Sequence, residues 1–189
     1  FGRNAAPSDG APPAAGEPHS AWAVDLGVEY ALAEVVASPA LGFEWIFWSG
    51  KDLDGAVGAW DPIARGYFTT AIREFLTGTN AGFYPTPQAA DTAGATNQHQ
   101  LSGYVRLVPL EDLTVTPRLS FFFLDEAAVQ AVGGQNERNR FAGTEWDTVV
   151  SYDYTEDVQL GFLYALFMPG TVYQQPNDST AQQLVTTVS

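Results

Sequence analysis

Large apolar residues alternate with small or polar ones along four runs of the segment 97–169. In the first run, the odd-numbered positions hold Leu101, Gly103, Val105 and Leu107. The even-numbered positions hold Gln100, Ser102, Tyr104 and Arg106. A period of two is typical of β-strands whose two faces meet different surroundings. We therefore predict four antiparallel strands, arranged as two hairpins, over this segment.

Similar alternation elsewhere extends this pattern along the chain. Further runs lie at residues 22–32, at about 40–49 and at about 181–189, which brings the expected total to about seven strands. The connections at 33–39, 108–113 and 154–158 are short, whereas those at 50–96, 125–143 and 169–180 are long. Short turns at one end and long loops at the other are typical of bacterial outer-membrane barrels.

The two faces of these runs require two different solvents. One face is too polar for a packed core, and the other is too rich in aromatic side chains to lie in water. Tyr152 and Tyr154 beside a turn, and Phe121, Phe122 and Phe123 near the opposite end, stand where interfacial aromatic girdles are expected. The runs also have the roughly 9–11 residues that a spanning strand needs.

The predicted fold class is therefore all-β, an antiparallel up-and-down transmembrane β-barrel. About seven strands are visible, and because bacterial barrels close with an even number, we expect this chain to form part of a larger barrel. A water-soluble antiparallel barrel or sandwich, whose buried face also alternates, is the alternative.

The domain organisation follows from where periodicity is lost. Residues 1–20 are rich in Gly, Ala, Pro and Ser without alternation, which predicts a flexible tail or loop. Residues 21–189 are expected to form the barrel wall, with a long extracellular loop at 50–96. So long an irregular segment in a compact domain indicates a functional loop.

Composition excludes several classes of function. The 22 acidic residues outnumber the 8 basic ones, which argues against a nucleic-acid partner. Without cysteine the chain has neither a disulfide framework nor a thiolate metal site. His19 and His99 have no second ligand at a metal-like interval, so we expect no metal and no cofactor.

From the alternation along each strand, eight charged residues are expected to face the interior of the barrel. They are Asp25, Glu29, Glu44, Arg106, Arg118, Glu145, Asp147 and Asp153. They form either a field that selects a polar solute or pairs that keep neighbouring strands in register. We expect Arg118 to face Glu145 or Asp147 on the next strand.

Catalytic signals are thin. Glu145 and Asp147 lie two residues apart on one strand face, which brings their carboxylates towards glycosidase-like spacing. Inward acids are ordinary in barrels, however, and the chain has no Gly-rich phosphate loop and no Gly-x-Ser-x-Gly elbow. We therefore expect no catalytic residues and no enzyme activity.

Several short motifs occur in a particular order along the chain. They are Trp48-Ser49-Gly50-Lys51-Asp52, Trp60-Asp61-Pro62, the run 97–106, Val108-Pro109-Leu110-Glu111-Asp112-Leu113 and Gly143-Thr144-Glu145-Trp146-Asp147. Together they resemble the C-terminal part of alginate-export-type outer-membrane barrels over most of residues 21–188. The chain departs from that pattern at Lys51, where an acidic residue is usual, and at Ser189, where bacterial barrels typically end in an aromatic residue.

The resemblance implies a bacterial outer-membrane channel, either a porin or a polysaccharide-export-like pore, that passes a polar solute through a hydrated lumen. The family exports an anionic polysaccharide along arginines, whereas only two inward arginines stand against six inward acids here. A general porin, or a pore for neutral or cationic solutes, is an equal interpretation.

Other functions remain open. An outer-membrane anchor or scaffold barrel with a blocked lumen, within a larger cell-envelope assembly, is the main alternative, and a soluble small-ligand barrel is a third. The expected partners are the outer-membrane bilayer, a polysaccharide or small polar solute, and other envelope proteins.

Overall fold

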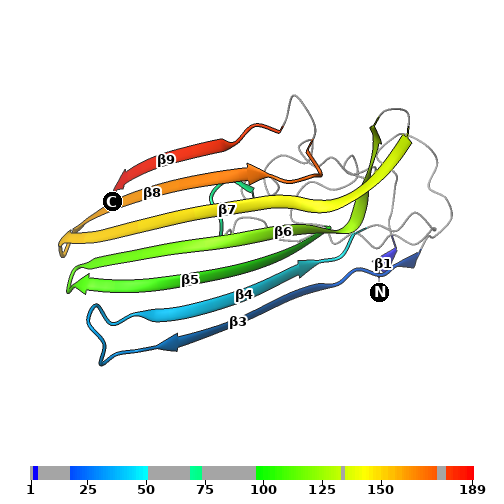
Figure 1. The fold of residues 1–189 in the computed structure, drawn as a ribbon. Helices are drawn as coiled ribbons and strands as arrows, with labels where there is room; N and C mark the ends of the chain where they lie inside the picture. The colour runs from blue at the N-terminus through cyan, green and yellow to red at the C-terminus, as the bar shows by residue number, and fades with distance from the viewer. Residues whose placement is uncertain (1, 4–17, 51–68, 74–96, 133–134, 174–177) are drawn as a thin grey trace.

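The computed structural model describes residues 2–3, 18–50, 69–73, 97–132, 135–173 and 178–189. Two short strands, β1 (Gly2–Arg3) and β2 (Pro18–His19), pair with each other. The other seven strands form one sheet (Figure 1): β3 (Ala23–Ala31), β4 (Ala40–Trp48), β5 (Gln98–Leu110), β6 (Leu113–Val132), β7 (Gln135–Thr155), β8 (Val158–Pro169) and β9 (Ala181–Val188). Among these described residues, no helix is long and apolar enough to cross a membrane.

The seven strands follow one another across the sheet in sequence order, and each pairs with the next in antiparallel fashion. Figure 1 shows the tight turns together at one end of the sheet, the turn end, and the longer connections at the other, the loop end. The prediction of an all-β, antiparallel up-and-down sheet is confirmed. Its architecture is that of a partial β-barrel.

The two edges of the sheet have the same direction. Within the described residues, β3 pairs only with β4 and β9 only with β8. Because the seven strands alternate in direction, β3 and β9 run parallel to each other. Antiparallel closure of this sheet into a barrel therefore requires an odd number of additional strands.

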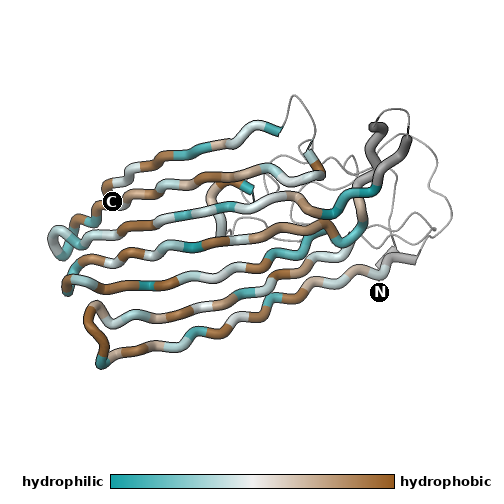
Figure 2. The backbone as a smooth tube through the Cα atoms, viewed as in Figure 1, coloured by the Kyte–Doolittle hydropathy of each residue, from teal (hydrophilic) through white to brown (hydrophobic). Residues whose placement is uncertain are grey.

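Side chains alternate between two faces, as the change of hydropathy from residue to residue in Figure 2 shows. We call the face that carries residues 69–73 the inner face and the opposite one the outer face. On the outer face at the loop end, Phe47, His99, Phe123 and Phe141 are successive cross-strand partners from β4 to β7. Their rings lie close together, with centroids 4.6 Å apart for Phe47 and His99 and 5.4 Å apart for Phe123 and Phe141.

This aromatic row has a counterpart at the turn end. Tyr152 and Tyr154 lie there with ring centroids 6.4 Å apart, and Tyr152 is the cross-strand partner of Leu113. The stretch from Leu113 to Phe123 is about 33 Å long as an extended strand, or about 25 Å high at a 40° tilt. That height equals the apolar band of outer-membrane barrels. Phe121 and Phe123 lie on the outer face, where a girdle residue would have to be, but Phe122 points inward and is fully buried.

The prediction of a long loop at 125–143 is wrong. Strands β6 and β7 continue past the sheet and pair from Ala128 with Asn139 to Val132 with Gln135, forming a two-stranded ribbon. The missed signal is the Gly133-Gly134 pair between the strands, a dipeptide typical of hairpin turns. The turn expected at 108–113 is likewise shorter, since only Glu111 and Asp112 separate β5 from β6.

Asn97 holds the base of this ribbon. Its side-chain oxygen accepts the Glu126 N–H at 2.6 Å, and its side-chain nitrogen donates to the Glu126 carbonyl at 3.1 Å. Asn97 itself has a φ of 51°, a left-handed conformation that asparagine tolerates better than most residues. The predicted boundary at residue 20, between a flexible tail and the barrel wall, stays a prediction, because most of residues 1–20 lie outside the described part of the chain.

Gly42 provides a test of the inner-face packing. A Cβ atom at Gly42 would lie 2.0 Å from Cζ of Tyr104, its cross-strand partner, and the ring is held by contacts with Glu29 and Arg118. We predict that Gly42→Ala lowers the free energy of unfolding by about 1–3 kcal/mol. The measurement is the temperature at which the folded, heat-modifiable form disappears on gels, and we expect this temperature to be lower for the variant than for the wild type.

Gly103→Ala is the matched control, because a Cβ atom there meets no atom within 4 Å. We expect it to leave the melting temperature unchanged or slightly raised, since alanine restricts the unfolded chain. Equal destabilisation by both substitutions would contradict this account of Gly42.

Candidate functional site

The cross-strand register brings most of the predicted inward charges together on the inner face. One row of partners runs through Glu29, Gly42, Tyr104, Arg118 and Asp147, and the adjacent row runs through Gly27, Glu44, Ser102, Ser120 and Glu145. Asp25 lies in the next row of the same face, close enough to Glu44 for the two carboxyl groups to interact, and Asp153 lies apart from this group. Asp153 is exposed at the turn end, where its carboxylate accepts a hydrogen bond from Gln159 at 2.6 Å.

Two ion pairs join strands of this face. Arg106 on β5 contacts Glu29 on β3 at 2.5 Å, and Glu29 also accepts the Tyr104 hydroxyl at 3.1 Å. Arg118 on β6 contacts Glu44 on β4 at 2.7 Å, and its guanidinium lies 4.7 Å from the centre of the Tyr104 ring. Both pairs skip one strand, so the four strands β3 to β6 are tied together by side chains as well as by the backbone.

The backbone register places Arg118 opposite Asp147, one of the two acids that the sequence predicts it to face. Its guanidinium forms an ion pair with Glu44, on the other side of β5. The two acids on β7 accept hydrogen bonds from a different part of the chain.

Residues 69–73 bind these two acids with their backbone. The N–H groups of Ile72 and Arg73 donate to separate oxygens of Glu145 at 2.6 and 2.7 Å, and the Ala71 N–H approaches Asp147 at 3.4 Å. Glu145 has no exposed surface and Asp147 only 3%. A buried carboxyl group loses its hydrating water, and these backbone donors replace part of it.

Side chains of the same segment fix it from both sides. Gln100 on β5 donates to the Thr69 hydroxyl at 2.7 Å, and Gln100 itself also contacts Ser102. Arg73 donates to the Tyr173 hydroxyl at 2.7 Å, and its guanidinium lies 5.7 Å from the Tyr173 ring centre. The segment therefore spans the inner face from β5 to the chain that follows β8.

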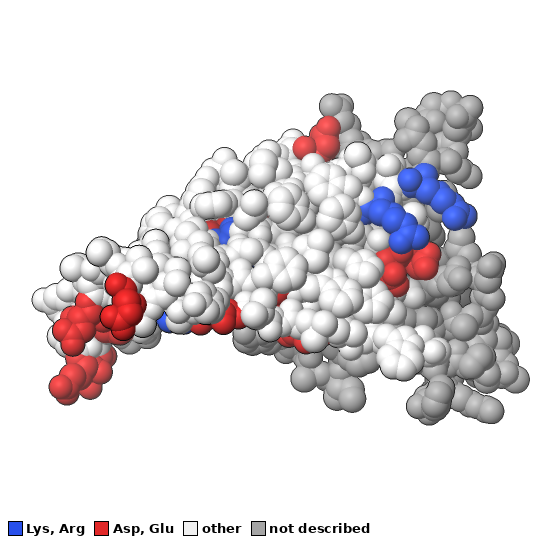
Figure 3. All heavy atoms as spheres, turned by 60° about the horizontal axis from the view of Figure 1, so that its bottom comes forward, with Lys and Arg blue, Asp and Glu red and all other residues white. Residues whose placement is uncertain are grey.

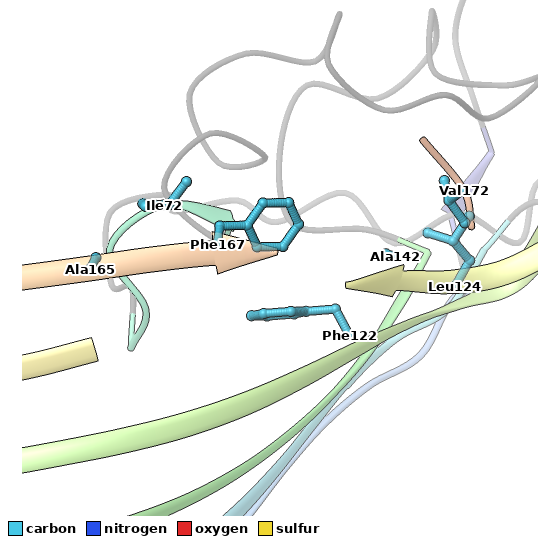
Figure 4. Packing of buried hydrophobic residues seen from close by; sticks show 7 residues of the cluster. All are labelled: Ile72, Phe122, Leu124, Ala142, Ala165, Phe167 and Val172. Atoms are coloured by element: carbon cyan, nitrogen blue, oxygen red, sulfur yellow. The ribbon is translucent and has the colours of Figure 1, made fainter. Parts of the chain in front are cut away.

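A small apolar cluster completes the docking at the loop end. Its buried members are Ile72, Phe122, Leu124, Ala142, Ala165, Phe167 and Val172. Figure 4 shows Ile72 beside Phe167, whose ring meets Phe122 edge-on with centroids 6.3 Å apart. Residues 69–73 thus dock on the inner face through both polar groups and an apolar cluster, which the sequence interpretation of a uniformly wet interior did not anticipate.

This arrangement is suited to holding a segment in place. Both oxygens of Glu145 accept peptide N–H groups, so this carboxylate is used as an anchor for the chain. Among the described residues, no group of three or more acidic, histidine or cysteine side chains is arranged to hold a metal ion.

Sequence reasoning identified Glu145 and Asp147 but missed the residues that bind them. The donors to the two acids are Ala71, Ile72 and Arg73, and the segment that holds them is fixed by Gln100 and Tyr173 from two other parts of the chain. The docked segment lies more than 70 positions from Glu145, and nothing in its composition announces a partner on a distant strand. The alternation along β7 was enough to place Glu145 and Asp147 on the inner face, because it depends only on the strand pattern.

Comparison with known proteins yields one family. No curated protein matches the chain. The sequence matches the family described as Alginate export over residues 2–187, nearly its full length. The curved antiparallel sheet with its polar inner face and apolar outer face is the architecture expected of such proteins. The chain therefore belongs to the Alginate export family of outer-membrane export proteins.

Proposed function

We propose that this chain forms part of the wall of an outer-membrane channel that passes a polar solute or a polysaccharide through a hydrated lumen. The observation that carries the proposal is the division of one continuous sheet into an outer face with two aromatic levels and an inner face with polar rows. Further strands, odd in number, would complete the barrel at the edges of β3 and β9. The role is passive transport, without catalysis or a cofactor.

Residues 69–73 would constrict this lumen. They lie on the inner face, and the anchors of the segment reach from β5 to Tyr173 beyond β8. The docking depends on Glu145, since one carboxylate satisfies two backbone donors. Release of the segment would widen the passage.

Glu145→Gln tests the constriction. Glutamine offers one acceptor oxygen and places an NH₂ donor against a peptide N–H, so docking should weaken by about 1–3 kcal/mol, or about five- to 150-fold in population. We predict larger or more frequent single-channel openings of the complete protein in a planar bilayer.

Glu29→Gln is the control, because it makes the same chemical change on the same face without touching residues 69–73. It should leave the opening frequency as in the wild type. Unchanged conductance of the inserted, correctly folded Glu145→Gln variant would contradict the role of the segment as a constriction.

The inner-face charges provide a test of selectivity. Arg106 and Glu29 pair with each other and are both partly exposed, with 44% and 36% of their side-chain surface accessible. Removing one partner leaves the other charge facing the lumen. We predict that Arg106→Gln shifts the reversal potential in a salt gradient towards cations and Glu29→Gln towards anions.

The solute class follows from the same balance. The described strand arginines of the inner face are matched by Glu29 and Glu44, while further acids lie on the same face. This supports a neutral or cationic solute at this part of the wall as well as a polysaccharide.

If Arg106→Gln and Glu29→Gln shift the reversal potential in the same direction, or do not shift it, these residues do not face the conduction path.

A second candidate is an anchor or scaffold barrel in an envelope assembly with other proteins. The docked segment favours it, because Glu145, Asp147 and Arg73 are all nearly inaccessible to solvent, as a permanently filled interior would require. A protein that inserts, is heat-modifiable and never conducts, even as Glu145→Gln, would support the anchor.

A further inference from the structure

The ribbon formed by the ends of β6 and β7 carries an exposed basic strand. Arg138 and Arg140 are both exposed and lie two positions apart on β7. Basic residues are scarce in this chain, 8 against 22 acidic ones, and the inner-face arginines Arg106 and Arg118 are occupied by Glu29 and Glu44. Arg138 and Arg140 are therefore available to an external anion.

These arginines lie just beyond the apolar outer face. Arg140 directly precedes Phe141, which belongs to the aromatic row at the loop end. Figure 3 shows a broad uncharged surface with acidic side chains gathered at the turn end and, at the loop end, basic side chains that lie next to acidic ones. A row of interfacial aromatic rings marks the level of the lipid headgroups in a membrane barrel.

We propose that Arg138 and Arg140 form a binding site for the phosphate groups of an outer-leaflet glycolipid of the lipid A type. The proposal rests on the proposed membrane location of the sheet. Guanidinium groups bind phosphate through paired, charge-assisted hydrogen bonds. Alternate positions of one strand lie about 7 Å apart, so the two arginines present neighbouring sites to one headgroup.

The surroundings leave both guanidinium groups usable. Arg140 donates through one nitrogen to the carbonyl oxygen of Asp125, which orients the side chain and leaves further N–H groups for a ligand. The carboxylate of Asp125 is engaged by the Gly50 N–H at 2.8 Å and by His99 at 3.5 Å, and a second acid, Glu126, follows it on β6.

The test is binding of lipid A to the purified full-length protein in detergent micelles, measured by native mass spectrometry. We expect bisphosphorylated lipid A to bind at least about tenfold more tightly than its dephosphorylated form, which has the same acyl chains. The double variant Arg138→Gln and Arg140→Gln should lose that preference, since each lost charged hydrogen bond weakens binding by about tenfold or more.

Arg106→Gln removes the same charge from the inner face and should keep the wild-type preference. If the double glutamine variant folds poorly, the double lysine variant, which keeps the charge but not the paired geometry, should bind with intermediate affinity. Equal binding of both lipid forms by the wild type would overturn the proposal.

Loss of binding to an oligomeric uronate, with lipid A binding intact, would assign the arginines to an anionic polymer and also overturn it. The readout is independent of conductance. A variant that conducts normally but loses lipid A separates this inference from the proposed channel.

Discussion

The continuous hydrogen-bonded ladder from β3 to β9 is the constraint on which the rest of the structure depends. It satisfies the backbone of each inner strand on both sides and forces successive side chains onto opposite faces. A slip of one residue between two strands would move the polar rows to the outer face and the aromatic row to the inner one. The register therefore determines both surfaces at once.

Side chains on the inner face reinforce that register. The pairs of Arg106 with Glu29 and of Arg118 with Glu44 each cross an intervening strand, and the Tyr104 ring fits over Gly42 because no Cβ atom is there. Exposed ion pairs contribute little stability singly, but these contacts share Tyr104 and form one network. The same residues are the charges that a passing solute would meet.

The docking of residues 69–73 places backbone donors against a buried carboxyl group. Glu145 is fully buried, a position that a carboxylate occupies at high cost unless donors replace its water. Two peptide N–H groups do so, and Ile72 adds apolar contact with the cluster around Phe122 and Phe167. The chain belongs to an export family, and in a transport barrel the inner face that carries these contacts would line the interior.

The sequence by itself determined the strands, their order and which face each side chain joins. Alternation over Leu101 to Leu107 or Trp146 to Tyr154 is a local property, because the direction of a side chain depends only on its own strand. It also placed all the candidate charges on one face before any contact was known. Strand ends were less well determined, since the ribbon of β6 and β7 depends on Asn97 holding its base.

Only the tertiary structure decided which charges meet. Arg118 lies opposite Asp147 in the register, yet its long side chain reaches Glu44 instead, while Glu145 and Asp147 bind a segment more than 70 residues away. Such choices depend on side-chain reach and on competition between distant segments for the same carboxylate. The alternation of residues shows only the direction of each side chain. It contains no information on which groups a side chain reaches or on which distant segments compete for them.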